Sequence, residues 1–145
     1  MAGLKFDDAF PKVISAKTHS ILDYIHAGTN FAVAALFRRR NRRASNAAFA
    51  LGASVLANAL MTDYPLGVFR LYSFKTHGIL DYGVAAASAA LPSLLGIEDT
   101  SEAGYFHAQG AGETLIAGLS DYSDSSGSRR HRRQVRQLFQ RRKAA

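Results

Sequence analysis

The chain has 145 residues, which is the length of one domain and enough for a core of four helices. It contains no cysteine, and this excludes disulfides, thiolate metal sites, covalently attached c-type haem and cysteine nucleophiles. The formal net charge of +7 is concentrated in two basic runs, a pattern that suits an anionic surface such as lipid headgroups or nucleic acid.

Four helices are predicted in chain order. The first covers residues 19–37 with Thr18 as its N-cap, and the second begins at Ser45 or Asn46 and ends near residue 61. The third begins after Thr76 and extends to about residue 95, and the fourth covers roughly residues 103–122. We expect residues 1–16 to form an amphipathic N-terminal lead-in and residues 123–145 a flexible basic C-terminal tail. The helices therefore occupy residues 17–122.

An octapeptide that occurs twice relates these helices to one another. Residues 17–24 have the sequence KTHSILDY and residues 75–82 have KTHGILDY, so seven of eight positions are identical at an offset of 58 residues. At the same offset, residues 62–64 correspond to residues 120–122. The repeat predicts two tandem helical hairpins, residues 17–74 and 75–122, that form an all-α four-helix transmembrane bundle with pseudo-two-fold symmetry.

The second and third helices have the composition of membrane spans. Residues 44–62 are uncharged over 19 positions, which is the length needed to cross a bilayer core. Small residues dominate both helices, as in helices that pack closely within membranes. The side that holds both termini carries 13 Lys or Arg against five in the first inter-helix loop, so the positive-inside rule places both termini in the cytoplasm. Five arginines in one exported loop are the best argument for a soluble bundle instead.

Six ionisable side chains are expected to meet at one end of this bundle. His and Asp four residues apart share a helix face, and this spacing begins both the first and the third helix. Two further aspartates end the second and fourth helices. The six candidate metal ligands are His19, Asp23, Asp63, His77, Asp81 and Asp121.

Two interpretations of this group are open. Functionally, imidazole nitrogens and carboxylate oxygens can bind a divalent cation, pass protons or hold a polar ligand at the membrane edge. Structurally, His–Asp, Tyr–Asp and Lys–Asp contacts can tie the four helix ends together and fix their register, and the sequence favours this second interpretation. A haem between His19 and His77 is disfavoured because the adjacent carboxylates make the pocket polar.

Two further ionisable residues lie deeper in the predicted helices. His26 has no counterpart at position 84, which is Val, so we expect a single buried or interfacial histidine. Glu113 lies near the middle of the fourth helix and is expected to pair with Asn58 or Asn30, or to face a partner subunit.

The basic runs are the predicted contact with an anionic surface. Aromatic residues are not interleaved in the first run, and no recognition motif follows it, so anionic lipid or an acidic partner surface is favoured over nucleic acid. The residues assigned to this surface are Arg38, Arg39, Arg40, Arg42, Arg43, Arg129, Arg130, Arg132, Arg133 and Arg136.

Two features of the sequence carry a family resemblance. One is the pattern His-x-x-x-Asp-Tyr at the start of the first and third helices, and the other is the segment TDYPLGVFR at residues 62–70. Over residues 17–122 the chain resembles small bacterial four-helix membrane proteins related to the SPW-repeat group. This resemblance implies an internal duplication and a location in the bacterial inner membrane. Because that group has no assigned activity, the resemblance implies no particular chemistry.

Three functions follow as hypotheses. The first is a non-enzymatic integral membrane protein, a structural or accessory subunit of a larger complex, with membrane lipids and other membrane protein subunits as partners. The second is a small ion-, metal- or proton-handling membrane protein that uses the six-residue group. The third is a soluble helical bundle with a nucleic-acid-binding basic tail. Catalytic triads, P-loops and dinucleotide fingerprints are missing from the sequence, so we expect no enzymatic activity, and the sequence leaves any cofactor unknown.

Overall fold

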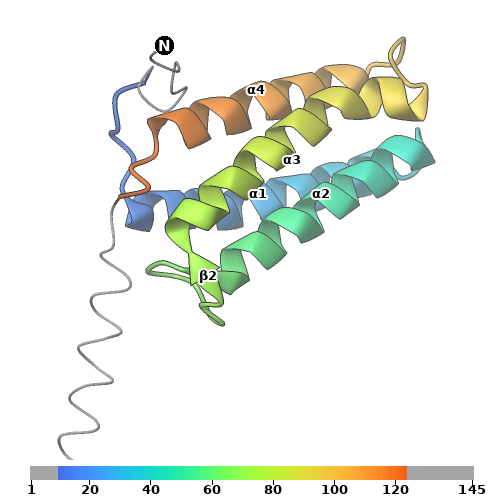
Figure 1. The fold of residues 1–145 in the computed structure, drawn as a ribbon. Helices are drawn as coiled ribbons and strands as arrows, with labels where there is room; N and C mark the ends of the chain where they lie inside the picture. Colours follow the sequence, from blue (N-terminus) through green and yellow to red (C-terminus); the bar gives the residue numbers. More distant parts are fainter. Residues whose placement is uncertain (1–9, 124–145) are drawn as a thin grey trace, which may run out of the picture.

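The computed structural model describes residues 10–123, and this part of the chain is mostly helical. It contains α1 (Ala16–Phe37), α2 (Arg42–Met61), α3 (Phe74–Leu95) and α4 (Ala103–Leu119). Helix α1 packs along α2, α3 packs along α4, and α2 contacts α3 (Figure 1). The chain therefore folds as two helical hairpins laid against each other, and the predicted helical class is confirmed for the described residues.

Both hairpins begin with the same capping arrangement, three residues earlier than the sequence predicted. Ser15 and Ser73 have extended backbones, and each side-chain oxygen accepts a hydrogen bond from a backbone N–H in the first turn, that of Thr18 at 3.3 Å and that of Thr76 at 3.2 Å. The prediction that Thr18 caps the first helix was wrong, because the N-cap is Ser15 and Thr18 lies within the first turn. The third helix likewise begins before Thr76 and not after it. The octapeptide consequently lies inside the helix and not at its edge.

Helix α2 also begins earlier than predicted. The side chain of Asn41 accepts from the N–H of Ala44 at 3.0 Å, so Asn41 is the N-cap and the helix takes in Arg42 and Arg43. Ser45, one of the two predicted caps, is instead buried and donates its hydroxyl to the carbonyl of Ala34 at 2.7 Å. The side chain thus ties α2 to α1 near their connecting turn.

Short extended segments join the hairpin ends. Strand β1 (Thr62–Asp63), which follows α2, pairs in parallel with β2 (Tyr72–Ser73), which precedes α3. Ser120, which follows α4, forms a parallel bridge with Ile14, which precedes α1. This bridge ends α4 at Leu119 and not at the predicted residue 122. Each pairing brings the residue after one helix beside the start of another, and the functional site is built there.

Large apolar side chains remain exposed along the helices and in the segment between α2 and α3. Helices α2 and α3 are long and apolar enough to cross a membrane. The buried core between the helices is made mainly of alanine, so the helices approach closely. Among the exposed apolar residues of the described part are Ile25, Leu36, Phe49, Val68, Phe69, Leu71, Ile79 and Leu94.

The close approach of α3 and α4 provides a test of this packing. A Cβ at Gly110 would lie 2.9 Å from the carbonyl oxygen of Ala85, whereas a Cβ at Gly112 meets nothing within 4 Å. We expect Gly110→Ala to lower the free energy of unfolding by about 1–3 kcal/mol, because the backbone of α3 has to move. In the same helix, Gly112→Ala serves as the matched control and is expected to be neutral or stabilising by up to about 1 kcal/mol. Thermal unfolding followed by circular dichroism measures both, and equal effects would argue against this helix contact.

Candidate functional site: a buried histidine–aspartate cluster

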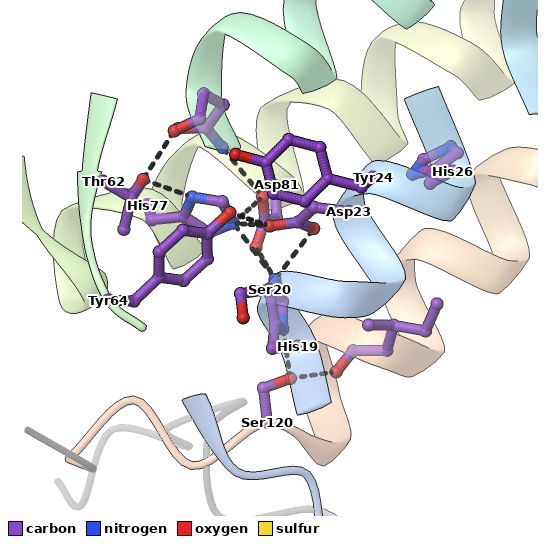
Figure 2. A network of polar contacts seen from close by, with 12 residues as sticks. His19, Ser20, Asp23, Tyr24, His26, Thr62, Tyr64, His77, Asp81 and Ser120 are labelled. Atoms are coloured by element: carbon purple, nitrogen blue, oxygen red, sulfur yellow. Dashed lines mark hydrogen bonds and ion pairs between the residues drawn. The ribbon is translucent and has the colours of Figure 1, made fainter. Parts of the chain in front are cut away.

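Four of the predicted side chains form one buried group, here called the His/Asp cluster: His19, Asp23, His77 and Asp81. Helix α1 contributes the first pair and α3 the second, each from the first two turns of its helix (Figure 2). None of the four is more than 4% exposed. The i, i+4 spacing puts each His and Asp on the same helix face, and the two faces point at each other.

The two imidazoles meet through their Nε2 atoms, which are 3.0 Å apart. Each of the two carboxylates contacts both Nε2 atoms. Asp23 places Oδ1 3.3 Å from Nε2 of His19 and Oδ2 3.2 Å from Nε2 of His77. Asp81 places Oδ2 3.3 Å from Nε2 of His19 and Oδ1 3.1 Å from Nε2 of His77. Two nitrogens and four oxygens therefore converge on one small volume.

Two hydroxyl groups fix the orientation of the imidazoles. Nδ1 of His77 lies 2.7 Å from the hydroxyl of Thr62, and Nδ1 of His19 lies 2.6 Å from the hydroxyl of Ser120. Each hydroxyl donates its single proton to a backbone carbonyl in the preceding helical turn, at 2.6 Å for Thr62 and 2.7 Å for Ser120. The hydroxyl oxygens can therefore only accept from the rings, and each Nδ1 carries a proton whether the imidazole is neutral or charged. This leaves each Nε2 aimed at the centre of the cluster.

The carboxylates are held by donors of their own. Tyr64 donates its hydroxyl to Oδ2 of Asp23 at 2.7 Å, and Tyr122 donates to Oδ2 of Asp81 at 3.0 Å. Burial, and then the nearby carboxylate, raise the pKa of the Tyr64 phenol far above its usual range, and the same two causes act on the pKa of Tyr122. Both phenols consequently remain protonated donors at any physiological pH.

Asn58 gives one carboxylate an additional partner. Its side-chain amide donates to Oδ1 of Asp81 at 3.0 Å, while its amide oxygen accepts from the hydroxyl of Tyr72 at 2.6 Å. The position 58 residues further along the chain is Ile116, so Asp23 has no equivalent amide donor. The two halves of the cluster therefore match in their imidazole, carboxylate, hydroxyl and phenol groups but differ here.

Aromatic rings cover the cluster. The ring of Phe74 packs against His19 at a centroid distance of 5.1 Å, against His77 at 5.7 Å and against Tyr122 at 4.7 Å. Tyr64 packs against His77 at 5.3 Å. These rings exclude water from the polar group, and this strengthens every electrostatic interaction inside it.

Two of the six predicted ligands do not join the cluster. Asp63 pairs with Arg70 at 3.1 Å, and Asp121 accepts from the backbone N–H of Ser123 at 3.0 Å. Successive side chains in extended backbone point to opposite sides, so when Thr62 and Ser120 face the histidines, the aspartates that follow them face away. The prediction that all six residues converge was wrong in this respect.

Thr62, Ser120 and Asn58 belong to the site although they were not predicted as part of it. A signal for the first two was available, because both copies have a hydroxyl residue immediately before the repeated Asp-Tyr pair. Asn58 has no counterpart in the second copy and left no such signal.

A second pair, between a half-buried histidine and a buried glutamate, lies deeper between α1 and α4. Nδ1 of His26 is 2.9 Å from Oε2 of Glu113, at the edge of a cavity of about 260 Å³. Glu113 therefore pairs with a polar group of this chain, as one of the alternatives had it, but that group is His26 and not Asn58 or Asn30. Asn58 contacts Asp81 instead, and Asn30 accepts a hydrogen bond from Tyr105 at 2.9 Å.

The first basic run lies at the opposite end of the helices from the His/Asp cluster (Figure 1). There Arg40 lies 3.6 Å from Glu102 and donates to Ser101 at 3.1 Å, and Arg43 donates to the carbonyl of Leu95 at 3.2 Å. The remaining residues assigned to an anionic surface, Arg129, Arg130, Arg132, Arg133 and Arg136, lie outside the described residues.

The cluster has the donor set and spacing of a divalent-metal site. Ligand atoms of His19, Asp23 and His77 all lie within 4.8 Å of one another, and Asp81 contacts both histidines from its own side. For metal–ligand bonds of about 2.0–2.1 Å, neighbouring ligand atoms in a tetrahedral site lie about 3.3 Å apart. The contacts of 3.0–3.3 Å between Nε2 atoms and carboxylate oxygens are close to this value. Hydroxyl groups on Nδ1 and phenols on the carboxylates are the outer partners such ligands require.

Compared with protein-family models, with curated proteins and with solved structures, the chain gives no match. The function is therefore argued from its own residues.

The hydroxyl that orients His77 can be tested separately from the cluster itself. We expect Thr62→Val to lower the free energy of unfolding by about 1–3 kcal/mol, because the buried Nδ1–H of His77 loses its acceptor. Thr62→Ser, which reproduces the residue found at position 120, keeps the hydroxyl and is expected to cost at most about 1 kcal/mol. Thermal unfolding measures stability, and the ¹⁵N chemical shifts of the His77 ring report the tautomer. An unchanged tautomer in the valine variant would show that the hydroxyl does not set it.

Proposed function

We propose that this chain is an integral membrane protein that binds one divalent transition-metal ion in the His/Asp cluster. The observation that carries the proposal is the convergence of two buried Nε2 atoms, 3.0 Å apart, with two carboxylates that each contact both of them. When neither Nε2 is protonated, their lone pairs repel each other unless a cation lies between them. A metal ion would supply that cation and take both nitrogens as ligands.

The charges of the four groups fit a divalent ion. Imidazoles that ligate a metal are neutral, so a divalent ion would balance the charge of −2 on the two carboxylates and bring the buried group to zero. The net charge matters because an uncompensated charge in a buried, aromatic-covered site is costly. Mixed nitrogen and oxygen donors suit zinc and the neighbouring first-row ions better than magnesium or calcium, which prefer oxygen ligands alone.

A bound ion would join parts of the chain that are distant in sequence. His19 and Asp23 belong to the first hairpin, and His77 and Asp81 belong to the second. An ion that binds the folded protein and not the unfolded chain stabilises the fold in proportion to its affinity. We infer that its role is structural, because burial of all four ligands and their complete set of outer partners leave no open coordination position for a substrate.

The proposed setting is a four-helix transmembrane bundle built from two tandem hairpins with pseudo-two-fold symmetry, in a bacterial inner membrane. The exposed apolar side chains and the length of the helices support a membrane setting, since α1 and α3 each have 22 residues, about 33 Å. The contacts His19–Ser120 and His77–Thr62 support the symmetry, because their partners correspond at the repeat offset. With both termini in the cytoplasm, the His/Asp cluster lies at the cytoplasmic end. The aromatic and apolar segment at residues 66–74 then lies at headgroup depth.

A role as an accessory subunit is the second candidate. The observation that favours it is an apolar groove of about 710 Å³ between α3 and α4, whose floor is formed by small residues such as Ala85, Ala89 and Gly110. Small residues let a further helix approach closely within a membrane. Binding of a structural metal and membership of a complex are compatible roles.

Metal content tests the first proposal. Protein purified without chelator is expected to contain about one zinc or similar ion per chain. The variants His19→Ala and His77→Ala are each expected to weaken metal binding by at least about 100-fold, because losing a ligand costs more than the 10–100-fold cost of losing an outer partner. His107→Ala, on the exposed face of α4, and Asp63→Asn, outside the cluster, are the matched controls and are expected to retain the ion. Elemental analysis and competition with a chromogenic chelator measure both quantities. Wild-type protein that stays metal-free and keeps its stability after incubation with zinc, manganese and ferrous iron would overturn the proposal.

Membrane integration is tested by extraction. The protein is expected to stay in the membrane pellet after washing with alkaline carbonate and to require detergent for release, because each hairpin exposes apolar side chains along its length. Release by carbonate alone would favour the soluble alternative. In a mild detergent, co-purification of a larger stoichiometric complex from native membranes would support the accessory role, and a lone monomer or dimer would count against it.

A further inference from the structure

The five arginines of the first basic run divide into groups with different surroundings. Arg40 and Arg43 reach across to the second hairpin, where they contact Glu102 and the carbonyl of Leu95. Arg38 and Arg42 instead line the mouth of a groove between α1 and α2, with a volume of about 410 Å³. Within residues 10–123, neither of these two guanidinium groups makes a hydrogen bond or an ion pair.

This α1–α2 groove is polar near the turn, where Ser45 and Asn46 also line it, and apolar further along the helices. Arg38 follows the last residue of α1 and Arg42 is the first residue of α2, so both lie at the turn between the helices. Phe31 lies seven residues before Arg38 and Phe49 seven residues after Arg42, which places both rings about 10 Å further along the helices. The two rings contact each other at a centroid distance of 5.4 Å, and Ala35 leaves room beside them.

An anionic amphiphile matches this combination. A phosphate group accepts charge-assisted hydrogen bonds from two guanidinium groups, which have no carboxylate partner here. The apolar walls are suited to an acyl chain, and their direction, from the helix ends toward the middle of the helices, is the direction of a lipid in a bilayer leaflet. A groove of this size falls within the range of small-ligand sites.

The second hairpin offers an internal comparison. At the repeat offset, Gly96 stands in place of Arg38 and Thr100 in place of Arg42. The corresponding place in the second hairpin therefore lacks both cations, and the charge that favours a phosphate is confined to the first hairpin.

We propose that the α1–α2 groove binds one anionic phospholipid, with the phosphate on Arg38 and Arg42 and an acyl chain against Phe31 and Phe49. The inference rests on the membrane location proposed above but not on the metal. It gives the basic run a specific ligand: two arginines hold the lipid, and Arg40 and Arg43 contact the second hairpin.

Native mass spectrometry in a neutral detergent tests this with three probes: phosphatidylglycerol, phosphatidylcholine and inorganic phosphate. Wild-type protein is expected to retain one phosphatidylglycerol per chain, to bind phosphatidylcholine at least about tenfold more weakly, and to leave phosphatidylglycerol bound when millimolar phosphate is added. Equal retention of the two lipids, or displacement by phosphate alone, would overturn the proposal.

Variants locate the site. The double variant Arg38→Ala/Arg42→Ala is expected to lower phosphatidylglycerol affinity at least about tenfold, while Arg39→Ala, in the same run but outside the groove, changes it less than about twofold. Ala35→Phe fills the apolar part of the groove from an exposed position and leaves the charge intact, so it is expected to weaken the lipid to a similar extent even if the double variant does not fold. Wild-type affinity in Ala35→Phe, or an equal loss in Arg39→Ala, would contradict the assignment.

Metal content is measured on the same samples. Retention of the ion in the groove variants, together with loss of the lipid, would separate this site from the His/Asp cluster. Loss of lipid binding in His19→Ala while the helices remain folded would contradict an independent site.

Discussion

The structure depends on two buried hydrogen bonds, each between a hydroxyl group and a histidine ring. Thr62 and Ser120 each donate to a carbonyl of the helix they follow and accept from Nδ1 of a histidine, so both imidazoles turn Nε2 inward. One of these bonds joins the end of α2 to α3, and the other joins the end of α4 to α1. Helices α4 and α1 are distant in the sequence, so the bond between Ser120 and His19, together with the bridge between Ser120 and Ile14, holds the end of the second hairpin to the start of the first.

The two buried carboxylates of the cluster require a compensating positive charge. Asp23 and Asp81 are buried, and within residues 10–123 no Lys or Arg contacts either carboxylate. The phenols of Tyr64 and Tyr122 donate hydrogen bonds but carry no positive charge. Compensation must come from the imidazoles themselves or from a cation bound between them, since an unpaired buried charge is strongly destabilising. The hydroxyl groups fit both cases, because they accept from Nδ1–H whether or not Nε2 also carries a proton. The convergence of both Nε2 atoms and both carboxylates on one volume is what supports a bound cation.

The sequence contained enough information to predict the four core residues of this site but not their environment. Repetition of the octapeptide, together with the i, i+4 spacing, placed His19, Asp23, His77 and Asp81 at one end of a helical protein. Asp63 and Asp121 were assigned wrongly because they were treated as helix ends, whereas Thr62 and Ser120 begin extended backbone, in which neighbouring side chains alternate. The His26–Glu113 contact was beyond sequence reasoning because it depends on how α1 and α4 are set against each other, and neither residue has a counterpart in the repeat.

The two ends of the helices are held by different kinds of interaction. At the cluster end the contacts are buried and satisfied on every side, whereas the pairing of Arg40 with Glu102 involves an arginine side chain that is 67% exposed and contributes little. Near the arginine end the hairpins are held by buried apolar contacts, in which Ala44 and Ala48 belong to one cluster with Ile97 and Phe106. The exposed arginines are therefore not needed to fix the hairpins. Two of them contact the second hairpin, and Arg38 and Arg42 line the groove proposed to bind a lipid.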